Sequence, residues 1–139
     1  MSITDLLFND IEVRKQMSIK VQWNNKDKGY IETKFDGSWT LDDFIEARKK
    51  WHRMIKGVDY VVPILLDLHN TADAPEGIMR QFIAIHRTPH PRQGHIYIMG
   101  MNETFQKLSK HLFDGVADKS KAVIVIESAD EITISYQPA

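Results

Sequence analysis

The chain has no cysteine among its 139 residues. Disulfide bonds, thiolate catalysis and cysteine-based zinc sites are therefore excluded. The chain also has no apolar run close to the roughly 18 residues that span a bilayer. Its first residues, MSITDLLFNDIEVRK, lack the basic and apolar regions of a signal peptide. We therefore expect a cytoplasmic protein with no membrane partner.

An excess of charge of one sign is also missing. The 18 basic and 19 acidic residues give a formal net charge of -1. Such a balance gives no electrostatic reason to expect nucleic acid as a partner. The motifs G-x-x-x-x-G-K-[ST] and G-x-G-x-x-G do not occur, so the usual signatures of nucleotide binding are lacking. We expect no cofactor.

Patterns typical of catalytic and metal sites are equally scarce. His86, His90 and His95 lie close together in the sequence, but Pro89 and Pro91 interrupt any helix that could align them. No histidine spacing fits a zinc site, so no metal ligands are expected. No serine lies in a G-x-S-x-G elbow. The sequence therefore favours a protein that is not an enzyme.

Two alternating segments begin the regular pattern. Apolar residues alternate with polar ones from Met17 to Trp23 and again from Ile31 to Asp36. Alternation of this kind is typical of half-buried strands. The polar loop NNKDKG joins them, which predicts a β-hairpin. We interpret residues 1–16 as an N-terminal extension and 17–139 as a single α/β domain, a length ordinary for one domain.

Helices and strands alternate after the hairpin. The expected elements are a helix from Leu41 to Gly57, a strand over 60–68, a helix over 76–87, a strand over 95–100, a helix from Asn102 to Gly115 and a strand over 121–126. Thr40 and Asp43 form a variant of the capping box at the first helix. The segment 129–136 is compatible with either a short helix or a terminal strand.

This order, β-β-α-β-α-β-α-β with an optional last helix, predicts a single mixed sheet of four or five strands. The crossovers between parallel strands should be right-handed. The apolar run YVVPILLDL implies a strand that is covered on both faces. Pro63 has no N–H to donate, so it should lie near the start of that strand, at an edge or at a bulge.

Two motifs carry a resemblance to a known domain. With G-x-W-T-L-D-D-F at 37–44 and I-L-L-D-L at 64–68, the chain resembles the STAS domain of sulfate transporters and anti-sigma factor antagonists, over residues 17–136. It looks most like small bacterial STAS-like proteins of unassigned function. The resemblance implies a STAS-like fold and a regulatory role in binding other proteins.

The resemblance also implies a loop that is phosphorylated on serine in the anti-sigma factor antagonists. That loop aligns with Asp67 to Gly77, with Asp73 and Gly77 at the positions of the family's aspartate and glycine. Ala74 stands at the position of the serine and has no hydroxyl. The phosphorylation switch is therefore not carried over. Asp73 and Glu76 are expected to cap the following helix and to discourage an anionic ligand.

Two functions remain open at this loop. The first is a non-catalytic interaction or regulatory module that binds a protein partner or a second copy of itself, as a homodimer. Its candidate surface consists of His69, Thr71, Asp73, Glu76, Gly77 and Met79. The alternative is a small-molecule or lipid-binding domain, or an enzyme that uses Asp67, His69 and Asp73. In that case a carboxylate would orient the imidazole as a general base.

Overall fold

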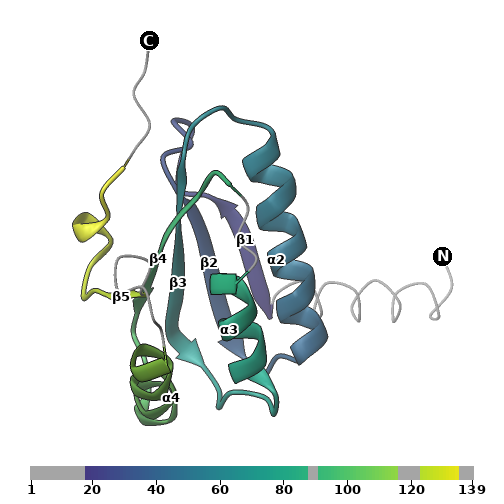
Figure 1. Ribbon diagram of the computed structural model, residues 1–139, viewed down its shortest axis with the longest axis vertical. Helices are drawn as coiled ribbons and strands as arrows, with labels where there is room; N and C mark the ends of the chain where they lie inside the picture. The colour runs from purple at the N-terminus through teal and green to yellow at the C-terminus, as the bar shows by residue number, and fades with distance from the viewer. Residues whose placement is uncertain (1–17, 88–90, 116–122, 135–139) are drawn as a thin grey trace, which may run out of the picture.

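The protein folds around one five-stranded sheet, as a computed structural model of residues 18–87, 91–115 and 123–134 shows (Figure 1). The strands are β1 (Ile19–Trp23), β2 (Ile31–Gly37), β3 (Val62–Thr71), β4 (Gln93–Met99) and β5 (Ile124–Val125). They lie side by side in chain order. β1 is antiparallel to β2, and every later neighbour is parallel. The predicted mixed α/β sheet is confirmed, with five strands.

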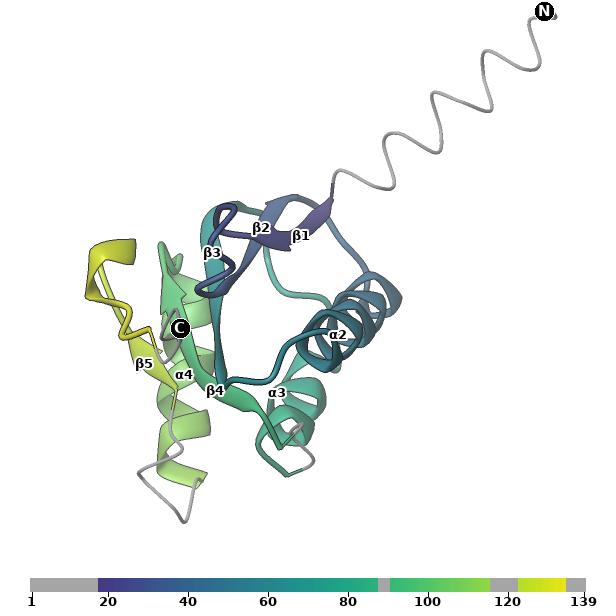
Figure 2. The same ribbon diagram turned by 90° about the horizontal axis from the view of Figure 1, so that it is seen from above.

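The three described helices all cover one face of this sheet (Figure 2). They are α2 (Leu41–Lys56), α3 (Ile78–Arg87) and α4 (Glu103–Gly115), and each connects two adjacent parallel strands. Right-handed crossovers that always step in the same direction place every helix on the same side. Buried residues from all three helices accordingly belong to a single core cluster.

Helix α2 begins and ends where the sequence predicts. The Thr40 hydroxyl accepts from the Asp43 N–H at 3.1 Å, and the Asp43 carboxylate accepts from the Thr40 N–H at 2.9 Å. This reciprocal capping box pairs backbone donors that the helix itself leaves free. At the other end, the N–H of Gly57 bonds to the carbonyl groups of the last turn.

Aromatic rings fill the core between the helices and the sheet. Phe44 of α2 contacts Trp51 and Phe82 edge-on, with ring centroids 6.0 and 5.7 Å apart. Trp51 is completely buried, and its indole N–H donates to the Thr33 hydroxyl at 2.9 Å. This bond satisfies the polar groups of both buried side chains and ties α2 to β2.

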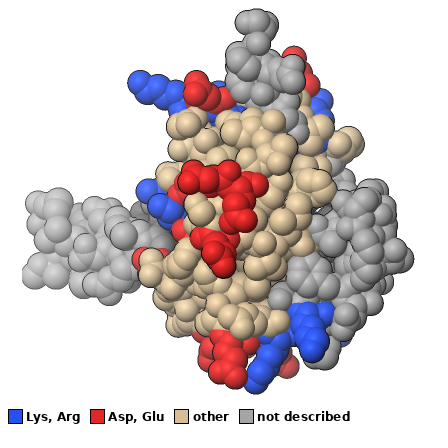
Figure 3. Space-filling view, turned by 90° about the vertical axis from the view of Figure 1, so that its left-hand side faces the viewer, with Lys and Arg blue, Asp and Glu red and all other residues tan. Residues whose placement is uncertain are grey.

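The helix-free face is covered in part by the C-terminal segment. Leu65 and Tyr97 pack there against Ile126 and Ile132 in a second, smaller cluster. The Tyr97 hydroxyl also accepts from the Thr133 N–H at 3.3 Å. β3 is therefore covered on both faces, as predicted, but helices cover only one of them. Exposed carboxylates of Glu127, Asp130 and Glu131 lie on this segment, on a side of the molecule where acidic side chains gather (Figure 3).

The predicted short helix over 129–136 is present only at its start, over the residues that the structure describes. Only Ala129–Glu131 is helical, as one turn of 3₁₀ helix, and 132–134 form neither helix nor strand. Ser128 and Glu131 make a capping box. The turn ends because Ile132 takes an extended conformation, which brings its side chain onto Leu65 and Tyr97. Residues 135 and 136 lie outside the described part.

Other boundaries move by a few residues. β3 continues to Thr71 rather than ending at Leu68, because β2 pairs with it as far as Gly37. α3 begins at Ile78 rather than at Glu76, since Gly77 has a φ of +88° that no right-handed helix accepts. Pro63 lies near the start of β3, where the register with β4 shifts, as predicted.

None of the described helices is long and apolar enough to cross a membrane. The predicted extension over 1–16 lies outside the described residues, as do Met17 and the start of the predicted strand at Lys121.

Candidate functional site

The predicted site lies at the carboxyl ends of β2, β3 and β4. These strands are parallel, so the loops that follow them meet at one edge of the sheet. Open α/β sheets commonly bind ligands and partners at this edge. The loop between β3 and α3, over 72–77, contains three of the six candidate residues, and the others lie at the adjoining ends of β3 and α3.

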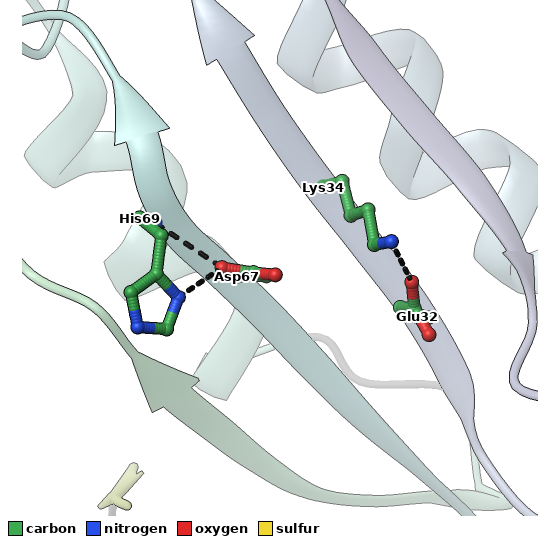
Figure 4. A network of polar contacts seen from close by, with 4 residues as sticks. All are labelled: Glu32, Lys34, Asp67 and His69. Carbon is green, nitrogen blue, oxygen red and sulfur yellow. Dashed lines mark hydrogen bonds and ion pairs between the residues drawn. The ribbon is translucent and has the colours of Figure 1, made fainter. Parts of the chain in front are cut away.

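Asp67 and His69 form a close pair near the end of β3 (Figure 4). The imidazole Nδ1 lies 2.7 Å from Asp67 Oδ1, and the same oxygen accepts the backbone N–H of His69 at 3.1 Å. Side chains alternate between the two faces along a strand. Leu66 and Leu68 belong to the helix-covered core, so Asp67 and His69 project to the helix-free face. The His69 side chain is 54% exposed, whereas Asp67 is only 17% exposed.

Gly100 packs directly against the imidazole. It follows β4 with a φ of +75°, and a Cβ placed there would lie 2.5 Å from His69 Cγ. Carbon atoms do not approach this closely without a shift of one of them. The backbone at residue 100 and the carboxylate of Asp67 therefore hold the ring from two directions.

Lys34 and Glu32 on β2 extend this polar strip across the sheet (Figure 4). Lys34 Nζ lies 3.0 Å from Glu32 Oε1. In the register of β2 with β3, Lys34 is the partner of Asp67. The hydrogen bond to Glu32 raises the pKa of Lys34, and the charges of Glu32 and Asp67 add to the effect. Sequence reasoning missed these two residues. The alternation of β2 put them on one face, but the register with β3 decided their neighbours.

Hydrogen bonds anchor the β3–α3 loop to three other parts of the chain. Trp39 Nε1 donates to Thr71 Oγ1 at 2.8 Å, and the Thr71 hydroxyl donates to the Ala72 carbonyl at 2.9 Å. The Ala72 N–H donates to the Gly37 carbonyl at 2.9 Å. Asp73 Oδ1 accepts from Thr104 Oγ1, in the first turn of α4, at 3.1 Å.

These contacts correct the expectation that Asp73 and Glu76 cap α3. Asp73 is bonded to α4 instead, and the first turn of α3 contains no acidic residue. The physical reason is Gly77, whose positive φ separates the acidic loop from the helix. Glu76 is exposed, and Met79 is half-buried against the core. The structure thus places His69, Asp73 and Glu76 at the surface, while Thr71 and Met79 have internal contacts.

The alternative grouping of Asp67, His69 and Asp73 is only partly assembled. Asp67 and His69 are bonded, but Asp73 accepts from Thr104 on the neighbouring helix. These three residues line neither the cavity beside β1 and α2 nor the cavity beside the β1–β2 turn.

The fold can be compared with known proteins. No protein-family model and no curated protein matches the chain. Among solved structures, the chain is similar to an uncharacterised protein of the DUF3478 family from Shewanella loihica, which has a SpoIIAA-like fold. The two share 13% sequence identity with a TM-score of 0.54, over 81% of this chain and 87% of that one. The chain has a SpoIIAA-like fold.

This likeness confirms the STAS-like architecture expected from the motifs at 37–44 and 64–68. In the SpoIIAA-like fold of this chain, the Trp of the first motif holds the end of β3 through Thr71. The Asp of the second motif is the partner of His69. Both motifs therefore contribute to the same carboxyl-end surface.

Proposed function

We propose that this chain is a non-catalytic interaction module that binds a protein partner through its carboxyl-end surface, formed by His69, Asp73 and Glu76. The observation that supports it best is the anchored loop over 72–77, which presents exposed carboxylates on a fixed backbone. A SpoIIAA-like fold with this loop is compatible with a regulatory role of the kind that the resemblance implies.

Anchoring matters because it lowers the cost of binding. A loop that is already ordered loses less conformational entropy when a partner docks on it. Thr71, Ala72 and Asp73 are each bonded to a different element or loop, so the exposed side chains start from defined positions. Functional residues are frequently found on loops that a rigid scaffold positions in this way.

The exposed groups also indicate the chemistry of the partner. Asp73 and Glu76 are both exposed and acidic, and Asp36 is exposed at the end of neighbouring β2. A partner surface with arginine or lysine side chains would complement them. Because such pairs are screened by salt, binding should weaken as ionic strength rises.

The absence of cysteine allows a direct test of this surface. A single thiol introduced by Glu76→Cys can carry a photo-crosslinker in cells that express the protein natively. We expect a protein adduct of defined mass, which disappears when Asp73→Lys is added. Asp59→Cys is the matched control, since Asp59 is also exposed but lies in the connection that leads into the amino end of β3.

Identical adducts from both thiols would contradict the assignment, as would an adduct that persists with Asp73→Lys. Circular dichroism and thermal unfolding of each variant would establish that the fold is retained. Loss of the adduct then reports on the surface and not on folding.

The Asp67–His69 pair supports a second candidate, the binding of a small molecule on the helix-free face. Asp67 fixes Nδ1, and the imidazole remains 54% exposed. NMR titration of the His69 ring with small carboxylic acids and alcohols would test it. Saturable shifts that vanish in Asp67→Asn would favour this candidate, and the absence of saturation would count against it.

A further inference from the structure

β1 is an edge strand with one side of its backbone open. The residues at its two ends bond inward, toward β2. The Ser18 carbonyl accepts from the Asp36 N–H at 2.8 Å, and the Asn24 N–H donates to the Tyr30 carbonyl at 3.0 Å. In an antiparallel pair such bonds fall on alternate residues. The N–H and C=O groups of Ile19, Val21 and Trp23 therefore point away from β2, and no strand pairs with them in the described part of the chain.

This edge has few of the features that usually protect an edge strand. β1 has five residues in regular register, no proline, no bulge and a single charge, that of Lys20. The opposite edge strand, β5, has only two residues. Proteins commonly shorten, bend or charge their edge strands to prevent association with other chains. β5 fits that description and β1 does not.

A groove of about 570 Å³ runs between the open edge of β1 and helix α2. Four charged residues of α2 line it in a stripe, with Asp43 and Glu46 in the first half and Lys50 and Arg53 in the second. Their spacing of three, four and three residues keeps them on one side of the helix. The stripe is thus acidic at one end and basic at the other.

We propose that the occupant of this edge is the β1 strand of a second copy of this chain, paired antiparallel about a two-fold axis at Val21. The two sheets would then form one continuous sheet of ten strands. This contact is separate from the carboxyl-end surface, so it does not depend on the function proposed above.

The register follows from the backbone pattern. Pairing Val21 with Val21 of the second copy also pairs Ile19 with Trp23, and all three outward-facing residues then form hydrogen-bonded pairs. Lys20 lies opposite Gln22. A shift by one pair, with Ile19 opposite Val21, would place the two Lys20 side chains opposite each other, which is unfavourable.

The side chains and charges fit the same symmetry. Ile19, Val21 and Trp23 belong to or pack against the helix-covered core, so their pairing would extend the core across the interface. A two-fold axis also sets the two α2 helices antiparallel. The acidic half of each stripe then faces the basic half of the other. A groove with one kind of charge would repel its own copy, whereas this pattern is complementary to itself.

Analytical ultracentrifugation of the full chain tests the proposal through a charge exchange. The wild type should be a dimer. Glu46→Lys and Arg53→Glu should each weaken self-association by about tenfold or more, because one half of each stripe then loses its net charge and both contacts lose their attraction. A mixture of the two variants should recover part of the self-association, since one of the two contacts then joins an unaltered acidic half with an unaltered basic half. Glu103→Lys on α4 and Arg80→Glu on α3 are exposed controls that should leave the dimer unchanged.

Introduced thiols test the register. Lys20→Cys mixed with Gln22→Cys should give a disulfide-linked dimer under mild oxidation, because facing residues of antiparallel strands come within disulfide range. Lys20→Cys alone should not, since its copies are diagonal neighbours about 7–8 Å apart.

A monomeric wild type at about 100 µM would overturn the proposal, and so would a dimer that resists both charge reversals. Hydrogen exchange gives a further check. In a monomer, slow exchange of the Val21 N–H would show that another segment, such as residues 1–16, occupies the edge. That result would also overturn the proposed dimer.

Discussion

Gly100 shows how one residue sets the geometry of the candidate surface. Its φ of +75° is costly for any residue with a side chain, and its Cα lies against the imidazole of His69. The sequence alone marks it only as the end of a strand. Its close approach to His69 arises from the register of β3 with β4, which local sequence does not reveal.

We predict that Gly100→Ala destabilises the protein by about 2–5 kcal/mol, from about 1–2 kcal/mol of backbone strain and about 1–3 kcal/mol of overpacking. Gly37→Ala is the matched control, because Gly37 also has a positive φ but has open space around it. It should show only the strain of about 1–2 kcal/mol. Urea unfolding measures both, and equal losses would show that contact with His69 contributes nothing.

Glu131 should make the stability of the C-terminal segment depend on pH. Its carboxylate accepts the backbone N–H groups of Glu127 at 2.8 Å and Ser128 at 3.0 Å, and these bonds lower the pKa of Glu131. A lowered pKa means that the stabilisation is complete above the ordinary glutamate value of about 4.3 and is lost as pH falls through the folded-state value.

We therefore expect Glu131→Gln to lower the melting temperature slightly at pH 7 and to match the wild type in strong acid. Thermal unfolding from pH 2 to pH 7 measures the difference. A gap that stays constant across this range would indicate that charge plays no part in the contact.

The elements themselves were largely predictable because their signals are local. The capping box at Thr40 and Asp43, the stop at Gly57 and the alternation in β1 and β2 each depend on residues close in sequence. The sequence places the start of α3 too early, because Pro75 also suits a first helical turn and the positive φ of Gly77 is visible only in the structure.

The contact between α2 and β2 depends on the buried bond from Trp51 to Thr33. We predict that Thr33→Val costs about 1–3 kcal/mol, because the indole N–H would be left unpaired in the core. Thr71→Val should cost less, since Thr71 and its bond from Trp39 are only partly buried and water can replace the hydroxyl. A double-mutant cycle with Trp51→Phe would show coupling, and strict additivity would contradict the assignment.

At the scale of the molecule, the order of the strands decides which surfaces exist. Because every crossover steps in one direction, the described helices α2, α3 and α4 lie on one face, and the other face depends on the C-terminal segment for cover. That segment reaches Leu65 and Tyr97, while Asp67 and His69 stay accessible nearer the carboxyl ends.

We expect Ile132→Ala to destabilise the protein by about 2–4 kcal/mol and to speed amide exchange in β4, because Ile132 is 8% exposed and seals this face. Ile134→Ala should have a smaller effect, since Ile134 is 47% exposed. Hydrogen exchange with mass spectrometry measures both. Equal effects of the two substitutions would show that the segment does not seal the sheet.

By itself, the sequence determined the order of the elements, the hairpin and the main helix with its caps, because hydrophobic period and capping act over a few residues. The STAS-like architecture was implied by the resemblance of the motifs at 37–44 and 64–68. It also excluded the family's phosphoserine, through Ala74. Only the tertiary structure decided that Asp67 binds His69 while Asp73 binds Thr104, and that β1 presents an open edge beside a stripe of opposite charges. These features depend on strand register and on contacts between residues far apart in the chain, which no local pattern encodes.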